Sequence, residues 1–504
     1  MKLSRCKIAV LCCLLIAPML LASCARRGAG EAETATQRAE YTGNRTDLWD
    51  EEKNPPYTGD AWVPPGGDEP ESPVPDEPEE PEQPDDPGDP TPELPDFDNA
   101  EFVILSSADG FFVPEDWLTE NAGMETGDAL LWRLFERNTE VEDTLNVSIR
   151  ITKANDSGIL DLVRNSTLAG NGGYHMVSAP LNVASALSGE GLYMNLYELP
   201  DLQLNQPWWN QNFIDSAELN GKLPMVTGAI SLSLYRASYI TLLNMDCIEE
   251  NEIDSIVERG EWTIEKYEEY CRLFTNYYFA GAVGSTYAVA AGFRHGLGVE
   301  LTVREADGKV LLRNLEEKTL AAMNRLSELC YQSESMTVVS DTDEAVNLFS
   351  SQPIALLVGR VWDAERIWDD YLVLNCGILP MPKLDSSQTA YSTGASLTHG
   401  TVAVPDYRDA LDTDMVGAVL EELCVVSEEK VLPIYFTKYT SRQEDMELLK
   451  SLQQMLRWDF MDVYCSQFGN STYWENAFRQ NSSISSVYAA ERSLMEERLN
   501  KLQF

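Results

Sequence analysis

The stretch "DALLWRLFERNTEVEDTLNVSIRI", residues 128–151, decides the fold class of this chain. Its first part has apolar side chains at helical spacing, at Leu130, Leu131, Leu134, Phe135, Val141 and Leu145. Asp128 precedes them where a helix N-cap is expected, and residues 147–151 alternate between apolar and polar as a strand does. The stretch therefore predicts a helix that runs directly into a β-strand.

The same alternation continues on both sides of this stretch. We predict strands at 101–107, at 174–180 and within "PIALLVGRVWDAERIW" (353–368), where the strand turns into a helix. Thr263 is expected to cap a helix, 399–405 to form a strand, and the last hundred residues to be mostly helical. Strand–helix–strand order predicts an α/β fold with parallel sheets, and ligands collect at the carboxyl ends of such strands.

The N-terminus has the pattern of an export signal. Three basic residues precede an apolar run from Ile8 to Leu21, which is shorter than a membrane-spanning helix. The run ends in Leu21-Ala22-Ser23-Cys24, which resembles a bacterial lipobox. That resemblance implies a lipoprotein signal peptide at 1–23, cleavage before Cys24, and acylation (palmitate included) that holds the chain on a membrane. A cleaved signal with an incidental cysteine is the alternative.

Residues 24–98 lack the apolar side chains that a folded core requires. The tract is rich in Pro, Glu and Asp and is predicted to be a disordered, extended spacer. It holds 22 of the acidic and five of the basic residues, so of the net charge of −45 about −31 belongs to residues 99–504. So acidic a body argues against nucleic acid as a partner, because phosphate binding requires clustered Lys and Arg.

The scattered cysteines and histidines give no metal or cofactor signature. Six cysteines lie beyond residue 98 without close spacing, and we favour buried free thiols while disulfides stay open. His175, His295 and His399 are far apart in the sequence, so no metal site and no cofactor is expected. The nucleotide-binding glycine motifs and GxSxG are absent from the sequence.

Five stretches in the region 99–504 resemble the family 1 extracellular solute-binding proteins of ABC importers, especially lipoprotein members. They are residues 128–149, "LYELPDLQLNQPWWNQ", "LNMDCIEENEID…GEWTIEKYEEYCR", "GILPMPKLDSSQTAYST" and "EKVLPIYFTKYTSRQEDMELL". The resemblance implies a two-lobed, type II periplasmic-binding-protein-like fold, with hinge strands that cross between the lobes near 226–239, 397–404 and 458. One lobe would hold about 99–230 and 400–455, and the other about 235–396 and 456–504.

The resemblance also implies a function. A maltose-binding-like protein would capture a small solute, by family default a sugar or oligosaccharide, and deliver it to ABC permease subunits. It would be a lipid-anchored monomer on the outer face of the cell membrane, in a Gram-positive bacterium, and would have no catalytic residues.

The candidate ligand-binding residues are aromatic and polar side chains at expected strand ends. Flat rings stack on sugar faces, and Asp, Asn and Arg fix hydroxyls. Trp362 and Trp474 occupy positions that resemble the sugar-stacking aromatics of maltose-binding relatives. The full set is Trp362, Tyr473, Trp474, Tyr235, Arg236, Asp109, Asn182 and Asp363. For each aromatic residue, packing in the core is an equal alternative.

Two other functions compete with transport. A surface sensor or adhesin lipoprotein without a transporter would share every one of these sequence features. A glycan-active enzyme would need two carboxylates across a cleft, but among 82 acidic residues such a pair carries no weight. We therefore expect a binding protein and no enzyme.

Overall fold

A computed structural model describes residues 94–109, 113–117, 126–248, 250–370, 374–407, 410–440, 442–469, 478 and 483–503. All of them lie in one compact unit, Pro87–Phe504. The predicted signal peptide, Cys24 and nearly all of the spacer lie outside the described residues and stay predictions.

The first lobe is built around a four-stranded sheet with the order β11-β3-β1-β2. The strands are β1 (Ala100–Ser107), β2 (Val147–Ala154), β3 (Met176–Pro180) and β11 (Gly400–Ala403). β1 pairs in parallel with β2 and β3, whereas β11 is antiparallel to β3. The helices that accompany this sheet are α2 (Val113–Asp116), α4 (Ala129–Leu145), α5 (Asp156–Ala169), α6 (Leu181–Gly189), the short 3-10 helix η1 (Leu196–Glu198), α7 (Gln211–Ala217) and α15 (Thr413–Val426).

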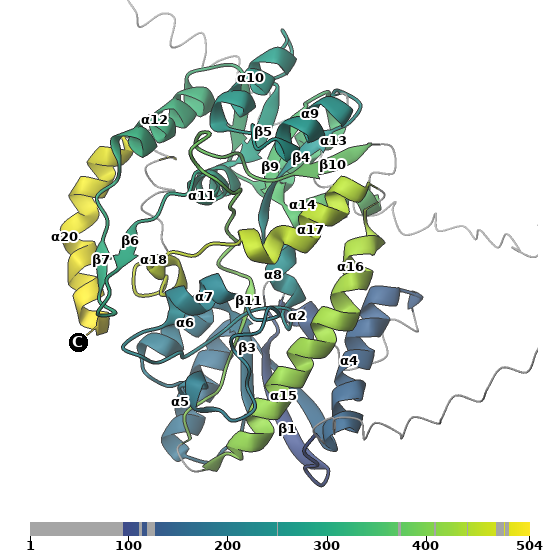
Figure 1. Ribbon diagram of the computed structural model, residues 1–504, viewed down its shortest axis with the longest axis vertical. Coiled ribbons are helices and arrows are strands. Elements are labelled where there is room, and N and C mark those ends of the chain that lie inside the picture. The colour runs from purple at the N-terminus through teal and green to yellow at the C-terminus, as the bar shows by residue number, and fades with distance from the viewer. Residues whose placement is uncertain are drawn as a thin grey trace, which may run out of the picture. The chain divides into compact units, whose positions relative to one another are not determined.

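The stretch 128–151 folds as predicted. The Asp128 carboxylate accepts hydrogen bonds from the backbone N–H groups of Leu130 and Leu131, at 2.9 and 3.2 Å, and so caps α4. Asn146 ends the helix in a left-handed conformation with φ of 48°, and β2 starts at the next residue. The buried face of α4 packs on α15 and β2 (Figure 1).

The second lobe is built around a five-stranded sheet with the order β10-β4-β9-β5-β8. These strands are β4 (Tyr239–Asn244), β5 (Ala282–Ser285), β8 (Met336–Val339), β9 (Leu356–Arg360) and β10 (Cys376–Leu379). Its helices are α9 (Glu250–Glu258), α10 (Ile264–Phe274), α11 (Thr286–Gly296), α12 (Glu317–Tyr331), α13 (Thr342–Ser351) and α14 (Val361–Asp370). The hydroxyl of Thr263 caps α10 as predicted, accepting from the Lys266 N–H at 3.4 Å.

The expectation of parallel sheets is only partly correct. β4 is antiparallel to its neighbours in the second sheet, as β11 is in the first. Each of these strands enters its sheet directly after the chain has crossed from the other lobe. It therefore begins at the junction and runs away from it, whereas the other strands run toward the junction and place their carboxyl ends there.

Several further elements connect the lobes. α8 (Leu232–Arg236) precedes β4, and α15 continues through a short π-helix (Ser427–Val431) into α16 (Leu432–Lys438). α17 (Gln443–Met455) packs on β10 of the second sheet, so the chain leaves the first lobe before residue 443 rather than at the expected 455. α18 (Phe460–Val463) contacts α6 and α7 of the first lobe, and its Asp462 pairs with Arg294 of α11 in the second lobe at 2.5 Å.

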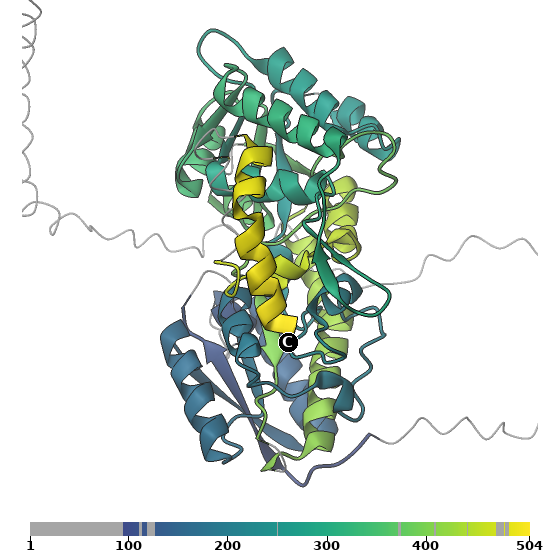
Figure 2. The same ribbon diagram turned by 90° about the vertical axis from the view of Figure 1, so that its left-hand side faces the viewer.

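The last helix, α20 (Ile484–Gln503), lies beside α12 and the hairpin of β6 (Thr302–Arg304) and β7 (Val310–Leu312) (Figure 2). None of the helices in the described residues is both long and apolar enough to span a bilayer. The cysteines beyond residue 98 are free thiols, all buried except the half-buried Cys247, in agreement with the favoured alternative.

Candidate functional site

The candidate site is the junction where strands from both sheets end. α6, α11 and α14 begin directly after β3, β5 and β9, and their first turns lie against two crossing segments, 237–239 and 394–400. The N–H groups of Leu181 and Asn182 donate to the carbonyls of His399 and Leu397, at 3.0 and 3.1 Å. From the other lobe, Val361 N–H donates to the Ser238 carbonyl at 3.0 Å. The starts of these helices are therefore held at one place.

Asn182 provides the polar group of the first lobe at this junction. It is half-buried in the first turn of α6. Its Oδ1 atom is buried and has no hydrogen-bond partner among the described residues. A buried amide oxygen without a donor is costly, so this atom is suited to accept a hydrogen bond from a bound solute.

Tyr287 is a half-buried aromatic residue on the side of the second lobe, and the fully buried Tyr239 packs against it. The rings of Tyr239 and Tyr287 lie 6.1 Å apart at an angle of 59°. The Tyr287 hydroxyl lies 3.4 Å from the Ser396 hydroxyl in the crossing segment, and Ser396 in turn lies 3.0 Å from the Thr398 hydroxyl. Aromatic faces beside hydroxyl groups are the combination that a sugar or polyol requires.

Arg360 and Asp363 form a closed pair at the end of β9. Asp363 accepts from the backbone N–H, Nε and Nη2 of Arg360, at 2.9, 3.1 and 3.1 Å. Burial lowers the pKa of Arg360, but the adjacent Asp363 carboxylate outweighs it, so the pKa of Arg360 lies above its usual value. Asp363 is fully buried, and it serves to neutralise and orient Arg360.

Arg236 links the two lobes through a buried ion network. Its guanidinium contacts Glu115 of α2 in the first lobe and lies 3.1 Å from Glu365 of α14 in the second. Tyr435 donates to Glu365 at 2.6 Å. Burial alone would lower the pKa of Arg236, but the carboxylates of Glu365 and Glu115 outweigh it and raise that pKa. For Glu365 burial is the larger effect, so its pKa is raised although Arg236 acts to lower it.

Trp362 lies half-buried beside this network. The Arg236 guanidinium is 5.1 Å from the centre of its ring, a distance that allows a cation–π interaction. Trp362 belongs to the first turn of α14, between Arg360 and the buried Glu365. The structure thus brings together four of the predicted residues: Trp362, Arg236, Asp363 and, across the junction, Asn182.

The other predicted residues lie elsewhere. Tyr235 is 1% exposed, donates to Gln453 at 2.5 Å and packs against Tyr435 and Phe436, so its ring belongs to the core and offers no face to a solute. Asp109 is exposed after β1, and its Oδ2 accepts from Asp156 N–H at the start of α5, at 3.0 Å. Tyr473 and Trp474 lie outside the described residues.

Sequence reasoning missed Tyr287, Glu115 and Glu365. Tyr287 follows a short strand in "VGSTYAV", a strand-to-helix pattern like that around Trp362, so a signal was present. Glu365 falls one helical turn after Trp362, on the same face. Glu115 carries no comparable signal, because its partner Arg236 is 121 residues away.

A hollow of about 470 Å³ lies between the lobes at another place, beside the crossing at Trp458. Arg304 of β6 spans it and donates to the carbonyls of Asp215 and Glu218 near the end of α7, at 3.2 and 2.6 Å. This hollow lies away from the strand ends, so the junction of helix starts is the better candidate. Within the described part of the chain, no group of three His, Cys, Asp or Glu is placed to hold a metal ion.

Known structures share this architecture. A cyclo/maltodextrin-binding protein complexed with maltotetraose has a TM-score of 0.50 at 14% identity, covering 80% of this chain and 95% of its own. An ABC substrate-binding protein from Listeria monocytogenes in complex with cycloalternan has a TM-score of 0.48 at 14% identity, covering 79% of this chain and 100% of its own. The Thermus thermophilus maltotriose-binding protein, bound with maltotriose, has a TM-score of 0.46 at 12% identity, covering 80% and 99%.

No family profile and no curated sequence matches the chain. The likeness to the cyclo/maltodextrin-binding protein shows that the chain has the fold of the two-lobed solute-binding proteins, which confirms the predicted fold class. The resemblance to family 1 solute-binding proteins is supported at the level of this fold.

Proposed function

We propose that this chain is a solute-binding protein that captures a small neutral sugar or polyol between its lobes and presents it to an ABC importer. The observation that carries the proposal is the charge balance of the junction. Arg360 is paired with Asp363, and Arg236 with Glu115 and Glu365. A charged solute would find its counter-ions already engaged, whereas a neutral solute needs only stacking faces and hydrogen bonds.

The aromatic and polar lining supports the same class of solute. The half-buried rings of Trp362 and Tyr287 offer stacking surfaces, and Asn182 and Ser396 offer hydrogen-bonding atoms. The protein of like fold with the TM-score of 0.50 was crystallised with maltotetraose, a neutral oligosaccharide. The proposal has four further parts: delivery to a permease, the lipid anchor at Cys24, the monomeric state, and location on the outer face of the cell membrane.

The test is a melting experiment on the full chain with maltotetraose, maltotriose, ribitol and D-mannitol, and with glutamate and lysine as charged comparators. We expect at least one neutral solute to raise the melting temperature and the charged ones to have no effect. A ligand at 100 times its Kd stabilises the folded state by about 2.7 kcal/mol. The effect should be lost in Trp362→Ala and kept in Tyr277→Ala, because Tyr277 is an exposed aromatic residue, 92% accessible, outside the junction.

A rise with glutamate or lysine alone would contradict the neutral class, and product formation from a glycan would contradict a binding role. The anchor is tested by fractionation of cells. The wild type should sediment with membranes, and Cys24→Ser should be released. Equal sedimentation of both would refute lipidation at Cys24.

A further inference from the structure

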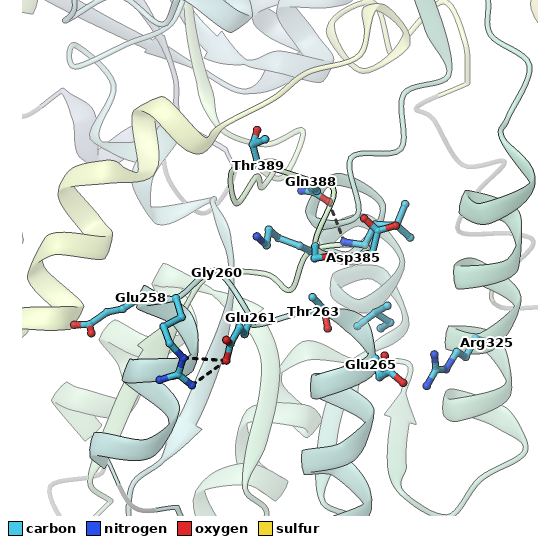
Figure 3. A pocket seen from close by; sticks show the side chains of 14 residues that line it. Glu258, Gly260, Glu261, Thr263, Glu265, Arg325, Asp385, Gln388 and Thr389 are labelled. Atoms are coloured by element: carbon cyan, nitrogen blue, oxygen red, sulfur yellow. Dashed lines mark hydrogen bonds and ion pairs between the residues drawn. The ribbon is translucent and has the colours of Figure 1, made fainter.

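A broad hollow on the second lobe lies outside the junction between the lobes. Its volume is about 780 Å³, within the range of small-molecule sites. Figure 3 shows it between the segment that joins α9 to α10 and the loop 385–389, with Glu258 and Glu265 on opposite sides. Every lining residue belongs to the second lobe, so the hollow does not depend on how the lobes close.

Lys383 is the buried cation of this hollow. The residue is 4% exposed, and its backbone is fixed by two hydrogen bonds, to Trp262 O at 3.0 Å and from Ile264 N at 2.8 Å. Its ammonium lies 5.1 Å from the centre of the Tyr391 ring. It makes no ion pair or hydrogen bond with any other residue that the structure describes. The side chain of Lys383 is thus mostly buried, and its ammonium, which lines the hollow, has lost part of its hydration without gaining an acceptor from the described residues.

Gly260 allows this placement. A Cβ atom at Gly260 would lie 3.1 Å from the Lys383 Nζ atom, and the glycine has a φ of +68°. The positive φ disfavours any residue with a side chain at this position, and an added Cβ atom would also be in tight contact with the ammonium. The absent side chain leaves the ammonium at the wall of the hollow.

The other cations around the hollow already have carboxylate partners. Arg259 pairs with Glu261 at 2.9 Å, and Arg325 pairs with the buried Glu268 at 2.8 Å. Asp385 accepts from the Ser387 hydroxyl and N–H, which lower the pKa of its carboxyl. Lys383 is thus the cation of the lining that has an open position for an acceptor.

Neutral donors complete the surroundings of Lys383. The first turn of α10, an 11-residue helix, lines the hollow at Thr263 and Ile264. Because the Ile264 N–H already donates to the Lys383 carbonyl and the Lys266 N–H to the Thr263 hydroxyl, the helix contributes the field of its N-terminus, which favours anions. The hydroxyl groups of Ser386 and Thr389 lie at the rim. The carboxylates of Glu258 and Glu265 at the two sides disfavour a polyanion.

We propose that this hollow is a second ligand site, which binds the single oxyanion, carboxylate or phosphate, of a small polar molecule at Lys383. The ammonium supplies the charge, α10 supplies its N-terminal field, and the rim hydroxyls hold the polar remainder of the ligand. This site is independent of the proposed solute site, because the two share no residue.

The test is calorimetric titration of the full chain at low ionic strength with two kinds of probe. Inorganic phosphate and glycerol 3-phosphate form the phosphate arm, and acetate and D-gluconate form the carboxylate arm. We expect saturable binding in one arm, weakened at least tenfold in Lys383→Met. Ser386→Trp, at an exposed position that fills the hollow, should have the same effect without a loss of stability. Lys266→Met is the matched control, because Lys266 already pairs with Glu269 at 2.6 Å, and it should leave affinity unchanged.

A purely structural lysine gives a different result. In that case Lys383→Met lowers the melting temperature, while the wild type shows no saturable binding in either arm, and the proposal is overturned. Binding that is equal in the wild type and in both hollow variants overturns it too. Trp362→Ala should leave oxyanion binding unchanged, which separates this site from the junction.

Discussion

Removal of the Arg236 guanidinium is the perturbation that tests the interlobe network most sharply. The side chains of Arg236 and Glu365 are 5% and 2% exposed, so Arg236→Met leaves Glu365 buried with only the Tyr435 hydroxyl as a partner. Loss of one member of a buried pair costs about 3–5 kcal/mol, and the lost cation–π contact with Trp362 adds about 1 kcal/mol. The Glu115 side chain is 40% exposed and can hydrate, so its lost pair adds little.

The predicted loss is a decrease of about 4–6 kcal/mol in the free energy of unfolding at pH 7. It should shrink as the pH falls. Burial already raises the pKa of Glu365, and without Arg236 this carboxyl takes up a proton at still higher pH, which removes the buried charge. Urea unfolding, followed by tryptophan fluorescence at pH 5 and pH 7.5, measures both effects.

The double variant Arg236→Met/Glu365→Leu supplies the control. An apolar pair leaves no buried charge, so most of the stability should return. If Arg236→Met costs less than about 1 kcal/mol at pH 7.5, or if the double variant is no more stable than the single one, the network does not have the energetic role that its geometry implies.

Three further changes test other parts of the fold. Glu421→Ala removes the acceptor of the Trp208 and Trp209 indole N–H groups, at 3.0 and 2.9 Å, and should lower the unfolding free energy by about 2–4 kcal/mol, whereas Glu421→Gln, which keeps an acceptor, should cost less. Burial lowers the pKa of His399 to about 4, so the neutral ring stabilises the wild type fully above pH 6.5, and this stability is lost as the pH falls toward 4. The difference in unfolding free energy between the wild type and His399→Gln should therefore change by up to about 1.4 kcal/mol per pH unit between pH 6.5 and 4. A difference that does not vary with pH would refute the assignment. Gly417→Ala places a methyl group 1.7 Å from the Pro200 carbonyl oxygen and should destabilise the chain by more than about 2 kcal/mol in the same assay, while an unchanged midpoint would show that α15 shifts freely.

The sequence predicted those elements whose signals are local. Asp128 and Thr263 cap helices as expected, because a cap needs only its own side chain and the next turn. The pattern of "PIALLVGRVWDAERIW" gave β9 and α14 together with Trp362 and Asp363. The direction of a strand within its sheet could not be predicted from neighbouring residues. β4 and β11 are antiparallel because the chain crosses between the lobes just before each of them, and a short stretch of sequence does not reveal such a crossing.

The place of a residue at the junction was predicted where the residue directly follows its own strand. Asn182 and Trp362 stand directly after strands, so the strand-end rule found them. Tyr235 was expected at such a strand end, but it lies in α8 ahead of β4, and its ring packs in the core against Tyr435 and Phe436, which lie 200 residues later in the chain. The pairing of Arg236 with Glu115 and Glu365 required the folded structure, because each pair joins distant segments.

The central claim, that the two lobes enclose a neutral solute at their junction, is tested most directly by small-angle X-ray scattering. The measurement compares the full chain alone and with a saturating amount of the sugar or polyol that raises its melting temperature most, in the wild type and in Trp362→Ala. The account predicts a smaller radius of gyration for the wild type with solute and no change for the variant. An unchanged radius in the wild type at saturation would contradict it.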